Sequence, residues 1–156
     1  MRDGYLAAQA DFMAHLAGDR QVRAQALIHF LPFMAPNTVV LSTFENPPSG
    51  LRRQLVSWVF RWMVRWVAGL PVNFAGTYLF HRKLLEKVHW KVVRSNTFVF
   101  SFELLAAFRK AGCGFKEVKV RTFPRADGRS REMSAGRVLR VFLELVRSRL
   151  QRMGHG

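Results

Sequence analysis

Apolar and polar residues follow one another along this chain in a pattern that predicts strands separated by helices. Short apolar runs at 11–16 and 38–42 predict buried strands, and the alternating run 115–121 predicts a third. The segment 73–80 is aromatic and mixed, with Gly76 as a break, and no element is assigned to it. Helices are expected at 4–10, 23–33, 51–68, 83–88, 98–110 and 134–152. This alternation indicates an α/β sheet.

Length and composition narrow the class of protein. The 156 residues are enough for one domain, 1–156, with its own core. The net charge of +15 together with 49% hydrophobic residues argues against disorder and favours anionic partners. Those partners are nucleic acid, phospholipid headgroups or a phosphorylated ligand. Nucleic acid is the least favoured, because the chain has neither an aromatic RNP motif nor a recognition helix.

Several functional classes lack their signatures. The single Cys113 excludes an internal disulfide and a cysteine-based zinc site, and the histidines show no ligand spacing. There is no G-x-S-x-G, no P-loop and no G-x-G-x-x-G motif. No window reaches about 18 uncharged apolar residues, so a spanning helix is not expected.

A basic loop at 121–132 contains an R-x-x-G-x-S pattern formed by Arg125, Gly128 and Ser130. An arginine fork, a flexible glycine and a small hydroxyl after a strand are suited to holding a phosphate. A solvated basic turn explains the same residues equally well. The polar turn at 17–21 also follows a predicted strand. Because ligands of open α/β sheets gather beyond strand carboxyl ends, the two turns are expected near one crevice.

The segment 51–68 combines tryptophan with arginine. On a helical wheel Trp58, Trp62 and Trp66 share one face, and Arg53, Arg61 and Arg65 are assigned to the opposite side. Such a helix suits a membrane interface, and the charge of the chain favours an anionic membrane surface. The alternative is an ordinary core helix with a solvated edge.

Two acidic residues are candidates for chemistry. Asp19 lies in a turn after a strand, where it is suited to ligating Mg²⁺ or Mn²⁺, although a turn aspartate or helix N-cap is the more common role. Glu103 lies amid apolar residues. It is either a buried carboxylate with a functional role or one paired with a nearby arginine.

Ordered motifs over nearly the whole chain resemble one enzyme family. The segment 17–21 stands where that family has D-x-D-x-Q, and 51–57 is similar to an R-x-x-x-S helix start. Further matches are 6–12, 73–82, 102–105, Gly112, 116–120 and the R-x-x-G-x-S loop. The family is that of the family 2 glycosyltransferases of the polyprenyl/dolichol-phosphate type.

The resemblance implies a partial GT-A-like (Rossmann-related) mixed sheet flanked by helices. It also implies an inverting transfer of a sugar from a nucleotide-sugar to a polyprenyl or dolichol phosphate. The expected location is cytoplasmic, peripheral at the inner face of the membrane. The residues implied are Asp19 and Glu103 for catalysis, Asp19 and Gln21 for Mg²⁺ or Mn²⁺, Arg125, Gly128 and Ser130 for the donor phosphate, and Arg53 and Ser57 for the acceptor phosphate.

The chain departs from the family pattern at three positions. Ala17 replaces the first acid of D-x-D, Thr43 stands where an arginine is expected, and Asn73 replaces an aspartate. The resemblance also begins just before the D-x-D turn, so we expect the acceptor-side half without the N-terminal nucleotide-binding part. A partner chain is then one candidate for supplying the nucleotide-binding part. These departures leave enzymatic activity open, and the alternative is a non-catalytic, membrane-associated protein that binds polyprenyl phosphate or a partner enzyme.

Overall fold

A computed structural model describes four continuous stretches of the chain and several single residues. The continuous stretches are 2–16, 22–45, 76–95 and 99–121. The additional described residues are 58, 61, 62, 65, 66, 97, 123, 142–144, 146 and 150. Statements on structure below refer to these parts of the chain.

The centre of the fold is a four-stranded mixed sheet. Its strands are β1 (Phe12–His15), β2 (Thr38–Phe44), β3 (Tyr78–His81) and β4 (Gly114–Val120), arranged in the order β1-β3-β2-β4. β3 is antiparallel to both β1 and β2, whereas β2 and β4 are parallel. A parallel pair needs a crossover connection, and α3 (Val99–Lys110) lies in the stretch between β2 and β4.

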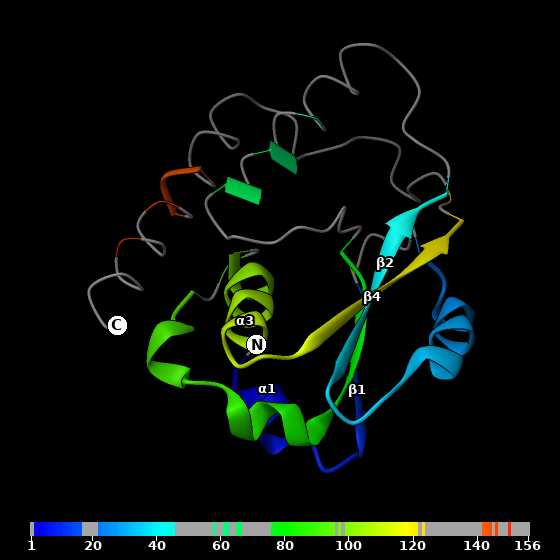
Figure 1. Ribbon diagram of the computed structural model, residues 1–156, viewed down its shortest axis with the longest axis horizontal. Coiled ribbons are helices and arrows are strands. Elements are labelled where there is room, and N and C mark those ends of the chain that lie inside the picture. Colours follow the sequence, from blue (N-terminus) through cyan, green and yellow to red (C-terminus); the bar gives the residue numbers. More distant parts are fainter. Residues whose placement is uncertain are drawn as a thin grey trace.

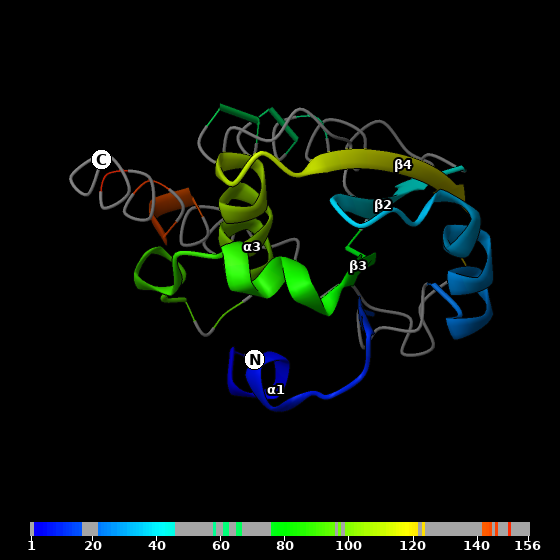
Figure 2. The same cartoon turned by 60° about the horizontal axis from the view of Figure 1, so that its bottom comes forward.

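Helices cover both faces of this sheet, as Figures 1 and 2 show. On one face lie α1 (Arg2–Ala7), α3 and the 3₁₀ helices η2 (Arg82–Lys87) and η3 (Trp90–Val92). On the other face lies η1 (Ala24–Phe33), drawn in blue. The protein is therefore a mixed α/β structure with a sheet between helices.

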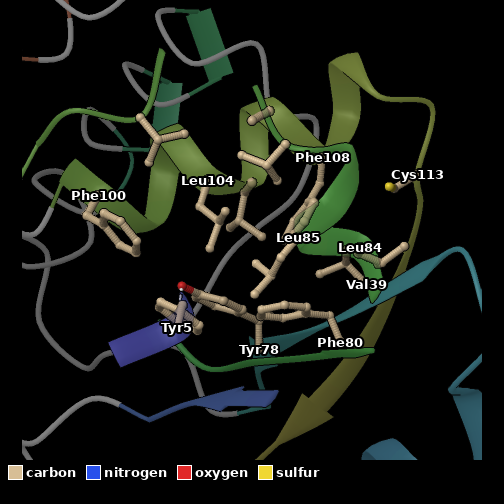
Figure 3. Packing of buried hydrophobic residues seen from close by; sticks show 14 of the residues in the cluster. Tyr5, Val39, Tyr78, Phe80, Leu84, Leu85, Phe100, Leu104, Phe108 and Cys113 are labelled. Carbon is tan, nitrogen blue, oxygen red and sulfur yellow. Dashed lines mark hydrogen bonds between the residues drawn. The ribbon is translucent and has the colours of Figure 1, made fainter. Parts of the chain in front are cut away.

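The larger part of the core lies between α3 and the sheet. Phe80 from β3 and Phe108 from α3 are fully buried, with ring centroids 5.0 Å apart. Figure 3 shows Tyr5 from α1 entering the same layer next to Tyr78. On the opposite face Phe30 of η1 packs with Val40 and Leu79 of the sheet. Successive side chains of a strand point to opposite faces, so β2, β3 and β4 each contribute residues to both cores.

Glycine ends α3 at a defined point. Gly112 has a φ of 76°, a left-handed conformation that favours glycine. The Gly112 N–H donates to the Arg109 carbonyl oxygen, and the Cys113 N–H donates to that of Phe108. This pair of bonds is a Schellman motif, which closes the helix and turns the chain into β4.

Most predicted elements that the structure describes are confirmed, with some differences. The short helix η3 was not predicted, and the helix predicted at 83–88 is the 3₁₀ helix η2. β3 was not expected, because its sequence Tyr-Leu-Phe-His does not alternate between apolar and polar residues. The segment 23–33 is a 3₁₀ helix rather than an α-helix, and it contains Pro32, which has no N–H to donate. Most of 51–68 and 134–152 lies outside the described residues. The described members of these two segments, residues 58, 61, 62, 65 and 66 and residues 142–144, 146 and 150, are helical.

Candidate functional site

The strand directions define one edge of the sheet as the candidate ligand-binding edge. β1 and β2 are both antiparallel to β3, and β4 is parallel to β2. β1, β2 and β4 therefore run in the same direction, and their carboxyl ends meet at one edge. β1 and β4 are the outer strands of the four, so three strand spacings, roughly 14 Å, separate them. The polar turn 17–21 and the basic loop each follow a strand that ends at this edge.

Most of the predicted site residues lie outside the described part of the chain. These are Asp19, Gln21, Arg53, Ser57, Arg125, Gly128 and Ser130. Their proposed roles in binding phosphate or metal stay predictions. Glu103 is the one predicted site residue that the structure describes.

Glu103 is buried in α3 and holds the chain segment that precedes the helix. One carboxylate oxygen, Oε2, accepts the backbone N–H groups of Arg94 and Ser95, both at 2.9 Å. The side chain is only 5% exposed. The sequence suggested an arginine side chain as one possible partner, but the bond to Arg94 is made by its main chain. The Glu103 carboxylate therefore has a structural role, because its two hydrogen bonds hold the backbone of Arg94 and Ser95 in place.

A chain of hydrogen bonds links four elements beside the same edge. The Tyr5 hydroxyl of α1 lies 3.1 Å from His15 Nδ1 at the end of β1 and 3.0 Å from the Tyr78 hydroxyl of β3. The Tyr78 hydroxyl donates to Ser101 Oγ of α3 over 3.4 Å. The imidazole of His15 stacks on the Tyr78 ring, with centroids 5.0 Å apart and planes 9° apart. These contacts fix the position of an imidazole where β1 ends.

Burial sets the charge of these groups. It lowers the pKa of His15 and raises the pKa of Tyr5. Burial also raises the pKa of Tyr78 well above its ordinary value. Desolvation disfavours the charged form in each case, so a neutral imidazole lies against two neutral phenols at neutral pH.

A second polar pair lies on the opposite face of the sheet at this edge. Ser42 Oγ donates to the Thr77 carbonyl oxygen at 2.9 Å and accepts the Thr77 N–H at 3.1 Å. Both side chains are fully buried, yet the Thr77 hydroxyl has no hydrogen-bond partner among the described residues. An unpaired buried hydroxyl costs about 1–3 kcal/mol. Thr77 is therefore a buried polar group at the sheet edge that the described part of the chain leaves without a partner.

The tryptophans of the segment 51–68 are exposed. Trp58, Trp62 and Trp66 are 59%, 56% and 58% exposed, and the rings of Trp62 and Trp66 stack at 6.0 Å. A core helix would bury these residues, so the core-helix alternative is wrong for this face. The assignment of arginines to the opposite side also needs correction. At about 100° per residue Arg61 and Arg65 flank the tryptophans, and both are exposed.

Neither a metal cluster nor a spanning helix is found in the described parts of the chain. No group of three or more His, Cys, Asp or Glu side chains lies close enough there to hold a metal ion. No described helix is long and apolar enough to cross a membrane. Cys113 is a free, buried thiol, and burial raises its pKa.

Comparison of the chain with protein-family models, curated proteins and solved structures finds no match. The site therefore rests on the residues and geometry of this chain.

Sequence reasoning missed the hydrogen-bonded group around His15. The chain has only two tyrosines, and the structure brings both together although they are 73 positions apart. One signal was present, because His15 is a polar residue near the end of an apolar run that precedes a polar turn. Its partners on α1, β3 and α3 depend on strand pairing, which the local pattern does not contain.

Proposed function

We propose that this chain is a membrane-associated, glycosyltransferase-like protein that transfers a sugar from a nucleotide-sugar to a polyprenyl phosphate. The observation that carries the membrane part is the row of three exposed tryptophans with two exposed arginines on one helical segment. The transfer itself comes from the family resemblance of the sequence and from the directions of the strands.

The tryptophan row has the properties of a membrane-interface helix. An indole ring is apolar over most of its surface and carries one N–H donor, so it is stable at the boundary between headgroups and acyl chains. Arg61 and Arg65 flank the row at the level where anionic headgroups would lie. Near an anionic surface each such cation contributes about 1 kcal/mol of attraction. The net charge of +15 adds a long-range attraction of the same sign.

The sheet edge supports the transfer chemistry. The two turns to which the resemblance assigns the donor diphosphate leave β1 and β4 at this edge. In the proposed reaction an oxygen of the lipid phosphate forms a bond to the anomeric carbon of the sugar. The bond from that carbon to the nucleotide diphosphate breaks, and the diphosphate leaves with the electron pair. Because the acceptor is already an anion, positioning and cationic side chains matter more than a strong base.

The proposal does not depend on a metal. In the turn 17–21 the chain offers the Asp19 carboxylate and the Gln21 amide, whereas Ala17 has no oxygen to donate. Mg²⁺ and Mn²⁺ favour carboxylate and carbonyl oxygens, so this donor set is poorer than a D-x-D pair. Mg²⁺ or Mn²⁺ held there would neutralise charge on the leaving diphosphate. We expect any such binding to be weak.

The second candidate function is a non-catalytic protein that binds a polyprenyl phosphate or a partner enzyme at the membrane. The observation that favours it is the environment of Thr43. The resemblance expects an arginine at this position, but the chain has a threonine in β2 that is only 8% exposed. A buried neutral side chain does not hold a phosphate in the way that an arginine does.

Vesicle flotation tests the membrane part. The full chain is mixed with vesicles of phosphatidylcholine alone, with added phosphatidylserine, or with an equal molar charge of polyprenyl phosphate. We expect flotation with both anionic vesicles, more with polyprenyl phosphate, and loss of flotation for Trp62→Glu. Phe12→Glu is the matched control, because Phe12 is an aromatic side chain on β1 that is 49% exposed. Equal flotation of Trp62→Glu and Phe12→Glu would contradict the membrane assignment.

A transfer assay separates the two candidates. Vesicles that contain polyprenyl phosphate are incubated with the chain and a panel of radiolabelled nucleotide-sugars, and lipid-linked label is extracted and counted. Sugar on the lipid supports the transferase. Flotation without any labelled lipid would favour the binding protein.

A further inference from the structure

The strand β4 lies at one edge of the sheet, and its outer side pairs with no strand in the described part of the chain. Figure 2 shows it above β2 and β3. Glu117 and Lys119 of β4 are exposed on the face that carries α3, and Lys116 is exposed on the face that carries η1. An edge strand of this kind is a template for pairing with another chain.

Two hydrogen bonds at the ends of β4 fix the direction of its backbone groups. The Gly114 N–H donates to the Asn37 carbonyl oxygen over 2.8 Å, and the Val120 carbonyl oxygen accepts the Glu45 N–H over 3.0 Å. Asn37 and Glu45 flank β2 in the chain, so the even-numbered residues of β4 bond to that side. Because backbone groups of successive strand residues point to opposite sides, residues 115, 117 and 119 direct their N–H and C=O groups away from β2. These groups have no partner among the described residues.

We propose that this edge pairs with β4 of a second copy of the chain, antiparallel and with Val118 beside a twofold axis perpendicular to the sheet. In a twofold contact, a residue that lies opposite a second residue places that second residue opposite its own copy. Glu117 of each copy then lies opposite Lys119 of the other. Both residues direct their backbone groups across the contact, so they exchange both N–H···O=C bonds. The two four-stranded sheets become one continuous sheet.

Side-chain charge selects this register. An antiparallel pair centred on Glu117 would place two carboxylates opposite each other, and a pair centred on Lys119 or Lys116 would place two ammonium groups opposite each other. Like charges directly opposite destabilise a strand pair, whereas opposite charges stabilise it. Lysines in an edge strand also oppose pairing with unrelated strands. The order of Glu117 and Lys119 therefore makes β4 complementary to its own copy.

An exposed aromatic ring beside β4 is a second observation that favours the contact. Phe33, the last residue of η1, is 43% exposed, and Lys116 Nζ lies 5.3 Å from its ring centroid. The twofold axis keeps the η1 helices of both copies on the same face of the joined sheet. Ile28 and Leu31 of η1 are also exposed. Exposed apolar residues grouped beside a strand edge commonly mark an interaction site.

Sedimentation velocity over a range of protein concentrations tests the association. About 0.15 M salt is used, because the Debye length of about 8 Å then screens most of the repulsion between two chains of net charge +15. We expect the average mass of the wild-type chain to rise toward that of two chains. Glu117→Lys and Lys119→Glu should each raise the dissociation constant about tenfold, because each places like charges opposite each other at both symmetric positions.

A mixture of the two variants tests the register. When Glu117→Lys pairs with Lys119→Glu, every cross-strand pair again joins a lysine to a glutamate, so the mixture should associate as the wild type does. Lys83→Glu is the matched control, because it makes the same charge change at an exposed residue of η2 and should leave association unchanged. Failure of the mixture to associate more tightly than either variant alone would overturn the proposal.

Amide hydrogen exchange measured by NMR tests the backbone contact. In dilute protein the amide of Val118 should be protected by β2, and the amides of Glu117 and Lys119 should exchange fast. At high concentration the amides of Glu117 and Lys119 should become protected. Protection of both amides in the dilute monomer would mean that another segment of the same chain covers the edge, and it would overturn the proposal.

The remaining outcomes also decide the question. A wild-type chain that stays a monomer at every concentration contradicts the proposal. Trp62→Glu should associate as the wild type does, and a monomeric Trp62→Glu would show that the exposed tryptophans, rather than β4, hold two copies together. Vesicle flotation and sugar transfer test the proposed function separately, so the failure of one proposal does not imply the failure of the other.

Discussion

The helix α3 and the tryptophan segment are both rich in large apolar residues, but they differ completely in burial. In α3 every residue from Val99 to Phe108 is buried, including Ser101 and Glu103. In the tryptophan segment the described indoles of Trp58, Trp62 and Trp66 are all more than half exposed. Hydrophobic content alone therefore does not determine where a helix of this protein lies.

The two segments differ in the contacts that their side chains make. The apolar side chains of α3 meet partners from the sheet, and its buried polar groups have hydrogen bonds, with Glu103 accepting two backbone N–H groups. The described side chains of Trp58, Trp62 and Trp66 are instead more than half exposed. A large exposed apolar surface rimmed by cations commonly marks an interaction site. The helix α3 is part of the core of the fold, and the exposed tryptophan segment is the contact surface that we propose for the membrane.

The largest expected effect comes from truncating one aromatic side chain in each region. Phe108→Ala removes a fully buried ring that packs on Phe80, and we expect the free energy of unfolding to fall by about 3–5 kcal/mol. Trp58→Ala removes a larger but exposed ring, and the expected change is within about 0.5 kcal/mol. Urea denaturation of both variants measures the two values. Similar losses in the two variants would contradict the division into core and contact surface.

The next-largest expected effect is the loss of stability on substitution of Glu103, which distinguishes a structural role of this residue from a catalytic one. Glu103→Ala leaves the N–H groups of Arg94 and Ser95 without their acceptor, so we expect a loss of about 2–3 kcal/mol in the free energy of unfolding. Glu103→Gln keeps one acceptor oxygen and should lose about 1 kcal/mol. Denaturation is measured together with sugar transfer. Full stability of both variants with loss of transfer would instead support a purely catalytic role.

The sequence predicted the regular elements better than their arrangement. The apolar runs predicted β1, β2, β4 and α3, because burial of a strand or helix leaves a local pattern. β3 was missed, since a four-residue central strand that is buried on both faces does not alternate. The strand order could not be predicted, because pairing joins segments such as 12–15 and 78–81 that are far apart in the chain.

The candidate site was predictable in part. The polar turns after strands and the isolated acid Glu103 were visible in the sequence. The strand directions place the carboxyl ends of β1 and β4 at one edge, and the convergence of the two turns stays a prediction. The bonds of Glu103 to residues 94 and 95 were not visible, because main-chain donors have no sequence signature. The same holds for Tyr5 and Tyr78, which meet only after the sheet has formed.

A smaller effect concerns Thr77, whose buried hydroxyl, unlike the carboxylate of Glu103, has no partner in the described part of the chain. Thr77→Val replaces the unpaired hydroxyl with a methyl group of similar size. We expect the free energy of unfolding to stay the same or to rise by about 1 kcal/mol, because no hydrogen bond is lost. Ser42→Ala is the control, since it removes an oxygen that makes two bonds, and it should destabilise the protein. A clear loss of stability in Thr77→Val would mean that the hydroxyl is bonded in solution.

The smallest expected effect is a pH dependence of the free energy of unfolding that comes from His15. Burial lowers the pKa of His15 in the folded state, so the unfolded chain binds more protons as the pH falls through its ordinary value of 6.5. The stability contribution of His15 is therefore present above that pH and is lost as the pH falls toward the folded pKa. His15→Gln should flatten the fall in stability between about pH 7 and pH 5 relative to His81→Gln. Equal slopes for both variants would argue against a buried, neutral His15.

Depth-dependent quenching of tryptophan fluorescence tests the membrane assignment most directly. The chain has four tryptophans, and Trp90, which is partly buried, is the one outside the exposed row. In Trp90→Phe all tryptophan emission comes from Trp58, Trp62 and Trp66. With phosphatidylserine vesicles that carry brominated acyl chains, we predict a blue shift of the emission and strong quenching, both reduced by high salt. Emission that keeps its solvent-exposed wavelength and is not quenched would contradict the account.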